Sequence, residues 1–433
     1  MSLALVGGIG VSALLLLLFI FGMPVGFSMA VVGFAGFSYV ISFNAALNMT
    51  GSVFWSVCSK YGLTVIPLFI FMGQIAFYSG VNKRLYRAAN KWVGHIQGGL
   101  AMATVIACSA FAAICGSNTA TAATMSTVAL PEMKKYGYSS VLSTGAIACG
   151  STLGVVIPPS VVLIIIGLAT EQSIARLFYG SIGAGLVLTL LLLLTIVVVC
   201  RIKPGLGLAA EKSSLKEKIA SLSGGIEMLI LFCLIMAGLY MGFFTPAEAG
   251  AAGAFFALLI AVMTRTLSWD NFKKAVKDTL RVSCMVIMLI AGAMIFGRFL
   301  AITRIPYDLA SFVAGLEMSD TMIMICISLI YIAGGAIMDA LALLLITIPI
   351  FFPLAVAMGY DPIWFSVTIT IVTTLGAVTP PVGATTYVVA GIADNVQLKD
   401  VFKGVSMFLP AYLLTILILI LFPWIITWLP GLI

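Results

Sequence analysis

The sequence has little charge and almost no histidine. Lys and Arg contribute 22 of the 433 residues and Asp and Glu contribute 15, so 9% of the chain is charged, against about 25% in a typical soluble domain. This shortage of charge excludes a soluble enzyme, a disordered chain and a nucleic-acid-binding protein with a basic face. His95 is the only histidine, which argues against a histidine-based metal site or catalytic triad.

Several motifs of catalytic sites are also missing. The chain has no Walker A sequence, no GxSxG and no HExxH, so neither ATP hydrolysis nor the corresponding hydrolase chemistry is expected. Its eight cysteines form no CxxC pair and mostly lie inside apolar runs. Buried reduced thiols are therefore expected rather than disulfides or a metal site.

The chain is instead rich in apolar residues. They make up 62% of the sequence, and the mean hydropathy is +1.20. A membrane-crossing helix needs roughly 20 apolar residues, so this length allows about a dozen apolar segments and no large extramembrane domain. The N-terminal run has no basic start and no evident cleavage site, which favours a first span over a signal peptide. The sequence predicts an all-α polytopic membrane protein.

The second half of the chain repeats landmarks of the first half 222 positions later. One ungapped offset that aligns many prolines and glycines predicts two homologous halves, at 1–204 and 219–433. The polar stretch 205–218 between them is the natural cytoplasmic linker. The matched landmarks are Pro24 with Pro246, Pro131 with Pro353, Gly137 with Gly359, Gly154 with Gly376, and Pro158-Pro159 with Pro380-Pro381.

The placement of basic residues predicts the orientation. If the chain begins outside and crosses at about 3–21, 25–42 and 63–80, cytoplasmic loops hold 18 of the 22 Lys and Arg residues. This is a strong positive-inside bias. The topology requires that two apolar stretches, 98–131 and 321–353, each enter and leave on the same side.

Both stretches are interrupted near the middle, at 116–119 and at 338–340. Each arm is short for a full crossing, so we expect two re-entrant hairpins that insert from opposite sides. A single kinked span in each place is the alternative. Opposite insertion of two homologous halves is an inverted-topology repeat, an architecture typical of secondary transporters.

Two further segments, 138–169 and 363–394, carry a tandem proline in mid-span. Proline removes amide donors and disfavours helix before it, so both segments are expected to be broken helices. Unwound carbonyls beside Ser and Thr hydroxyls suit Na⁺, and the half-helix N-termini present free N–H groups to an anion. Prolines that merely kink two packed helices are the alternative.

The two hairpin tips carry the polar residues of greatest interest. Asn118 can donate to a carboxylate while its carbonyl faces a cation, although the small hydroxyl residues around it also suit helix packing. Asp339 is an intramembrane acid and by default a functional candidate. Its expected partner is Arg298 or a bound cation, and a purely structural Arg298–Asp339 ion pair is the alternative. Outside the membrane, 83–95 and 269–281 are expected to form amphipathic helices on the cytoplasmic surface.

Four segments, 116–138, 151–160, 243–254 and 373–391, resemble the large membrane subunit of tripartite ATP-independent periplasmic (TRAP) transporters. The similarity extends over essentially the whole chain. It implies an ion-transporter-like, elevator-type importer of an organic acid anion in the bacterial inner membrane, driven by Na⁺. It also implies two partners, a small four-helix membrane subunit and a soluble periplasmic substrate-binding protein.

The resemblance also implies site residues. It places substrate contacts at Asn118, Thr119 and Arg298, and the arginine resembles the sialic-acid branch, where it would meet a sugar-acid carboxylate. It places Na⁺ at the hairpin tips and unwound helices. The implied Na⁺ ligands are Gly116, Ser117, Asn118, Thr152, Gly154, Met338, Asp339, Thr374 and Gly376.

Four rival functions remain open at this stage. A carrier of C4-dicarboxylates or other carboxylates would share the same architecture, as would an anion:Na⁺ symporter that works without a binding protein. A passive channel is the third rival. The fourth is an intramembrane enzyme that uses Asp339 as a base, and the shortage of intramembrane carboxylates counts against it.

Overall fold

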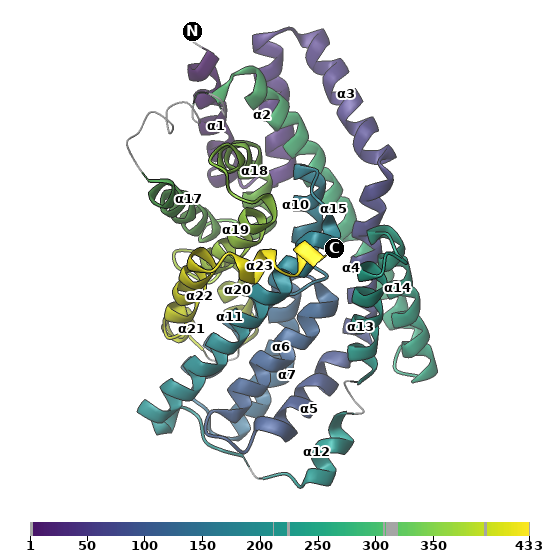
Figure 1. The fold of residues 1–433 in the computed structure, drawn as a ribbon, viewed down its shortest axis with the longest axis vertical. Coiled ribbons are helices and arrows are strands. Elements are labelled where there is room, and N and C mark those ends of the chain that lie inside the picture. The colour runs from purple at the N-terminus through teal and green to yellow at the C-terminus, as the bar shows by residue number, and fades with distance from the viewer. Residues whose placement is uncertain are drawn as a thin grey trace.

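The computed structural model describes residues 3–210, 212–222, 226–305, 308, 319–393 and 396–432, and these residues form helices and no strand. The first part of the chain forms α1 (Leu3–Phe19), α2 (Val25–Val40), α3 (Phe43–Ser59), η1 (Tyr61–Thr64), α4 (Val65–Tyr78), α5 (Val81–Val93), α6 (Gly99–Cys115), α7 (Asn118–Lys135), α8 (Ser140–Ser151), α9 (Leu153–Val156), α10 (Val161–Thr170), α11 (Ile174–Ile202) and η2 (Pro204–Leu206). The second part forms α12 (Leu215–Leu222), α13 (Ile226–Tyr240), α14 (Pro246–Met263), α15 (Trp269–Ile302), α17 (Asp320–Gly335), α18 (Ala340–Ala357), α19 (Pro362–Gly376), α20 (Ala384–Ile392), α21 (Leu398–Ser406), α22 (Leu409–Leu421), α23 (Trp424–Thr427) and η3 (Pro430–Leu432). Figure 1 shows this arrangement.

The helices confirm a multi-pass membrane protein. Within the described ranges, six helices are long and apolar enough to cross a bilayer, or seven if the bent pair α21 and α22 counts as one span. Six shorter apolar helices accompany them, including α6 and α17. A helix of 16 or 17 residues, such as these two, is only about 25 Å long, which is less than the roughly 30 Å of a bilayer core.

The short helices belong to the two predicted hairpins, which the structure forms. Helix α6 packs on α7 after a break at Gly116 and Ser117, and α17 packs on α18 after a break that ends at Asp339. A hydrogen bond of 2.9 Å from Thr347 Oγ1 to the Tyr331 hydroxyl joins α17 to α18. Figure 1 shows α6 and α7 in the lower half of the view and α17 and α18 in the upper half.

The predicted C-terminal ends of the hairpins were wrong. They were placed at 131 and 353, at the matched prolines, whereas α7 continues through Pro131 to Lys135 and α18 continues through Pro353 to Ala357. A proline removes one donor, and neighbouring helices and hydroxyl side chains satisfy the freed groups within a membrane protein. Two prolines therefore lie inside helices here rather than at their ends.

Both broken helices are present. The first is interrupted between α9 and α10, where Ser160 caps the following helix, and the second is interrupted between α19 and α20. The predicted end of the second segment, 394, lies outside the described residues. The predicted linker also carries structure, because η2 overlaps its first residues and α12 begins at Leu215.

The scaffold helices pack in two similar pairs, α2 with α15 and α4 with α14. Glycines allow backbone to approach backbone in the first pair, since a Cβ added at Gly26 would lie 2.9 Å from the Leu289 Cα and one at Gly33 would lie 2.8 Å from the Phe296 Cα. Small residues at such crossings are typical of membrane helices. With the 222-residue offset, α2 corresponds to α14, and α4 corresponds to a part of α15. The α2–α15 pair is therefore equivalent to the α14–α4 pair, as a pseudo-twofold relation of the two halves requires.

Two features of the helices differ from expectation. Residues 269–281 form no separate surface helix, because α15 runs without interruption for 34 residues, or about 51 Å. Such a helix exceeds the bilayer core, so its polar start extends beyond the membrane without a break. Helix α3 was not predicted at all, because exposed Ser and Asn residues interrupt its apolar pattern.

Candidate functional site

The tip of the first hairpin is a tight turn with a capped helix after it. Gly116 adopts a left-handed conformation with φ of 61°, which favours glycine. Ser117 then caps α7, and its side chain accepts a hydrogen bond from the Ala120 N–H at 3.4 Å. The Ser117 hydroxyl also lies 3.3 Å from the Thr119 hydroxyl. The residues predicted at this tip are therefore grouped around one helix N-terminus.

The first tip contacts the first broken helix. A Cβ added at Gly154 would lie 2.6 Å from the Ser117 carbonyl oxygen, and a Cβ at Gly116 would lie 3.2 Å from the Pro159 carbonyl oxygen. Only glycine allows this approach at Gly154 without a shift of the backbone. Carbonyl oxygens of the turn and of the unwound segment thus lie on adjoining backbones.

Asn118 has an unusual environment within this group. Its side chain is buried, and its Oδ1 atom has no hydrogen-bond partner among the described residues. An unpartnered buried amide oxygen costs about 1–3 kcal/mol. A bound cation or a substrate donor would remove that cost, so the residue fits the role predicted for it.

The second hairpin tip contacts the second broken helix in a corresponding way. A Cβ added at Gly376 would lie 2.7 Å from the Gly335 Cα. The Ala336 carbonyl accepts hydrogen bonds of 3.0 Å from both the Val382 and the Gly383 N–H groups. Each hairpin tip therefore packs against the break in its own half of the chain.

Asp339 and Met338 occupy the last positions of the second tip. Asp339 caps α18, and its Oδ2 accepts a hydrogen bond of 3.0 Å from the Leu341 N–H. The Met338 N–H donates to the Gly334 carbonyl at 3.0 Å. Both side chains retain access to solvent.

The expected ion pair between Arg298 and Asp339 is wrong for this structure. No ion pair joins these two described residues. Arg298 projects from α15 with an exposed side chain, and the exposed Asp339 carboxylate caps α18. Arg298 also lies apart from the hairpin-tip contacts described above. The structure does not bring it together with Asn118 or Thr119 through any hydrogen bond.

The predicted threonine ligands differ in their surroundings. Thr374 is fully buried and its hydroxyl donates only to the Ile371 carbonyl, at 2.7 Å. Thr152 is also fully buried, but its hydroxyl lies 2.7 Å from the Cys149 carbonyl and 2.6 Å from the Tyr412 hydroxyl. Sequence reasoning missed Tyr412, because it lies in an ordinary apolar run 260 residues away from Thr152.

Each broken helix also packs on helices of the other half of the chain. Helix α10, from the first broken helix, packs on α18 and α19, and α20, from the second, packs on α7 and α8. Glycine contacts follow the same exchange, since Gly180 would meet the Ile363 side chain and Gly404 approaches the Val141 carbonyl. These contacts join the two hairpins and the two broken helices, α6–α10 and α17–α20, into one group of helices, the broken-helix unit.

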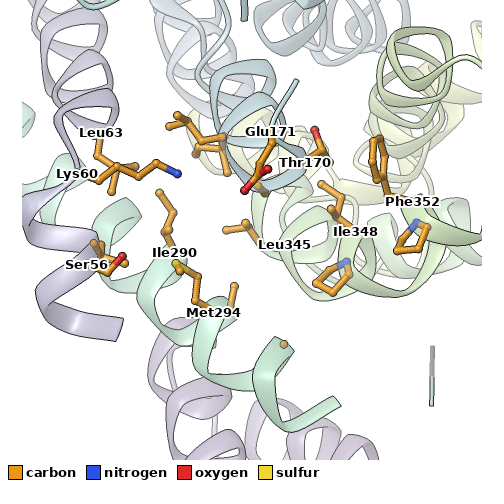
Figure 2. Close-up of a pocket in the computed structure, with 18 residues that line it drawn as sticks. Ser56, Lys60, Leu63, Thr170, Glu171, Ile290, Met294, Leu345, Ile348 and Phe352 are labelled. Atoms are coloured by element: carbon orange, nitrogen blue, oxygen red, sulfur yellow. The ribbon is translucent and has the colours of Figure 1, made fainter. Parts of the chain in front are cut away.

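A cavity of about 300 Å³ lies beside this unit, between α3, α10, α15 and α18. Figure 2 shows Lys60 and Glu171 facing each other across it, and apart from Ser56 and Thr170 the other residues that line it are apolar. None of the predicted site residues lines this cavity. The cavity therefore lies between the broken-helix unit and helices α3 and α15, and it does not coincide with the predicted Na⁺ or substrate site.

The donor set consists of oxygen atoms, and all but the Asp339 carboxylate are neutral. Among the described residues, no three His, Cys, Asp or Glu side chains come together as a metal site. Carbonyl groups, hydroxyls, an amide and a single carboxylate are ligands that suit a hard cation. The N-terminus of α7 is capped by the Ser117 hydroxyl, whereas that of α18 is already occupied by the Asp339 carboxylate.

Comparison with known proteins decides the family. Residues 12–425 match the family model described as the tripartite ATP-independent periplasmic transporter, DctM component. The chain belongs to this TRAP transporter family. It is a transporter permease of the bacterial inner membrane with several spans. Large permeases of the family work with a small membrane subunit and a periplasmic binding protein.

Relatives of this large permease carry different substrate names. A C4-dicarboxylate TRAP large permease of Pseudomonas aeruginosa is 36% identical over 335 residues, covering 77% of this chain and 78% of that one. A sialic acid TRAP large permease of Vibrio cholerae is 28% identical over 403 residues and 93% of each chain. An isethionate TRAP permease of Oleidesulfovibrio alaskensis, named DctMQ, is 30% identical, covering 93% of this chain and 63% of that one.

A solved structure shares the fold. The YdaH transporter of Alcanivorax borkumensis, described as having an unusual topology, superposes with a TM-score of 0.64 at 13% identity. The match covers 88% of this chain and 90% of that one. At such low identity the likeness shows the fold alone.

Proposed function

We propose that this large permease is the translocating subunit of a Na⁺-coupled secondary transporter that imports an organic acid anion. The observation that carries the proposal is the paired contact of each hairpin tip with a broken helix, Ser117 with Gly154 and Gly335 with Gly376. Two such junctions bring unwound carbonyls together where charge is costly, and a cation stabilises them. A periplasmic binding protein would deliver the substrate.

In this proposal, Na⁺ binds before substrate at both tips. The ligands are those proposed from the sequence: Gly116, Ser117, Asn118, Thr152 and Gly154 in the first half, and Met338, Asp339, Thr374 and Gly376 in the second. Ordering of the tips then completes an anion site that includes Asn118, Thr119 and Arg298. The broken-helix unit moves against α2, α4, α14 and α15 in an elevator movement, and the cavity at Lys60 and Glu171 lies on that boundary.

The substrate is proposed at the level of a carboxylate. Arg298 favours a sugar acid such as sialic acid, as the sequence suggested. Greater identity to permeases named for C4-dicarboxylates favours those smaller anions instead. The test of function must therefore compare both classes.

The test is uptake by proteoliposomes that contain the large permease, its small subunit and the cognate binding protein. Labelled sialic acid and labelled C4-dicarboxylates are offered with and without an inward Na⁺ gradient. Accumulation of one class above its outside concentration, only with Na⁺ and the binding protein, is expected. Uptake without the binding protein would favour the independent symporter, and equilibration without accumulation would identify a channel.

A further inference from the structure

A second cavity has not been given a role by the transport proposal. It measures about 830 Å³ and lies between α5, α6, α11 and α13. Ser109 is the one polar residue among those that line it, and the remainder are Ala, Leu, Ile, Phe and Trp side chains. An apolar cavity of this kind does not hold ordered water, so its natural occupant is apolar.

One wall of the cavity is the amphipathic helix α5. Leu85, Ala88, Ala89 and Trp92 line the cavity, and their spacing puts them on one stripe of the helix. The same helix carries four basic residues and no acidic one. Three of the four, Arg84, Arg87 and Lys91, lie along one side of that apolar stripe.

Two ion pairs hold this flank at the edge of the cavity. Arg84, next to Leu85, pairs with Glu227 at 3.1 Å, and Lys91, next to Trp92, pairs with Glu217 at 3.3 Å. The Trp92 indole N–H donates to the Lys218 carbonyl at 3.1 Å. Arg84 Nε is buried and has no hydrogen-bond partner among the described residues.

The charge at this edge favours an anion. Within 81–93 and 215–227, the described residues supply six Lys and Arg side chains against two Glu side chains. A basic cluster that adjoins a membrane helix on the cytoplasmic side attracts anionic lipid headgroups. Arg87 is exposed between Arg84 and Lys91 and forms no ion pair with a described residue.

We propose that this cavity binds an acyl chain of an anionic phospholipid from the cytoplasmic leaflet, whose headgroup lies against Arg84, Arg87 and Lys91. The cavity reaches Ile157, within the first broken helix. A bound chain would therefore contact α6 and the unwound segment that begins at Ile157. This proposal does not depend on the identity of the substrate or of the coupling ion.

The test measures lipid retained by the full-length permease after purification in detergent. Phosphatidylglycerol and phosphatidylcholine with identical chains are added, and native mass spectrometry counts the bound lipids. A preference for phosphatidylglycerol is expected. The double variant Arg87→Gln/Lys91→Gln should reduce that preference about tenfold while the apolar cavity remains. Lys273→Gln/Lys274→Gln on α15 removes the same charge elsewhere and should change nothing.

A second variant tests the cavity itself. Ala110→Trp would fill the cavity and should abolish retention of both lipids. In a separate experiment, added phosphatidylglycerol should protect the cysteine of Ala110→Cys from a maleimide in the absence of the small membrane subunit. Equal retention of the two lipids by the unmodified protein would overturn the proposal. So would protection of the cysteine only when the small membrane subunit is present, since a protein helix would then fill the cavity.

Discussion

The phenolic oxygen of Tyr412 lies 2.6 Å from Oγ1 of Thr152. Both side chains are fully buried, and the Tyr412 hydroxyl also donates to the Cys149 carbonyl at 3.0 Å. This group ties α22 to the junction of α8 and α9, one short helix before the first break. A residue from the C-terminal part of the chain thereby fixes a threonine proposed as a Na⁺ ligand in the N-terminal part.

We expect Tyr412→Phe to weaken Na⁺ binding. The change leaves the Thr152 hydroxyl without one partner, and a lost buried hydrogen bond costs about 1–3 kcal/mol, so the Na⁺ concentration for half-maximal uptake should rise about tenfold. Sodium titration of uptake in proteoliposomes measures this. Tyr331→Phe is the matched control, because its buried hydroxyl bonds Thr347, which is no proposed ligand. Equal effects of the two variants would contradict a positioning role for Tyr412.

The unpartnered oxygen of Asn118 leads to a second prediction. Asn118→Ala should remove Na⁺-dependent uptake and leave the protein folded, because deletion of an unsatisfied buried group carries little cost in free energy of unfolding. Ser126→Ala removes another buried, unpartnered oxygen from the same helix, and uptake should persist. If both variants transport normally, Asn118 has no part in the site. Uptake and thermal unfolding of the purified proteins provide the two measurements.

Glycine at the junctions of tips and breaks is expected to be essential. A Cβ at Gly154 would lie 2.6 Å from the Ser117 oxygen and one at Gly376 would lie 2.7 Å from the Gly335 Cα. Gly154→Ala and Gly376→Ala should each separate a hairpin tip from the broken helix that it contacts. Each should abolish uptake, although the amount of permease in the membrane stays normal. Gly391→Ala in α20 is the control, since its added Cβ meets no atom within 4 Å. Full uptake by Gly154→Ala would mean that the tip contact is dispensable.

The sequence predicted the places where helices break better than the contacts between them. Glycine and polar residues at 116–119 and 338–340 were sufficient to locate both tips, because each change in backbone direction needs such residues locally. The break at Gly116 and Ser117 was predicted from these residues, whereas the cap that Asp339 forms on α18 was not.

Other features depended on packing that a single sequence does not display. The Tyr412–Thr152 contact joins residues 260 positions apart, and nothing distinguishes this tyrosine from others in apolar runs. The expected Arg298–Asp339 pair was inferred from opposite charges at membrane depth, yet the local N–H of Leu341 takes the Asp339 carboxylate instead. The first hairpin was expected to end at residue 131, whereas α7 continues through Pro131 to Lys135.

The exposed position of Arg298 allows its proposed role in substrate binding to be tested apart from stability. Arg298→Gln should leave thermal unfolding unchanged, because the side chain makes no ion pair with a described residue. If the guanidinium meets a carboxylate, the KM for uptake should rise about tenfold or more, as expected for loss of a charge-assisted hydrogen bond. Arg176→Gln, at an exposed position in α11, should alter neither quantity. An unchanged KM would remove Arg298 from the substrate site.

Asp339 offers a way to separate a structural cap from an ion ligand. Asp and Asn cap helices about equally well, whereas Ala costs about 1 kcal/mol, so Asp339→Asn should preserve the stability that Asp339→Ala loses. The loss of negative charge should nevertheless raise the Na⁺ requirement of Asp339→Asn, because a neutral amide oxygen attracts a cation less strongly. Asp361→Asn is the control, since Asp361 caps α19 by accepting from the Trp364 N–H at 2.8 Å and is no proposed ligand. Thermal unfolding and Na⁺ titration of uptake distinguish the two roles, and a normal Na⁺ requirement in Asp339→Asn would leave Asp339 with the cap alone.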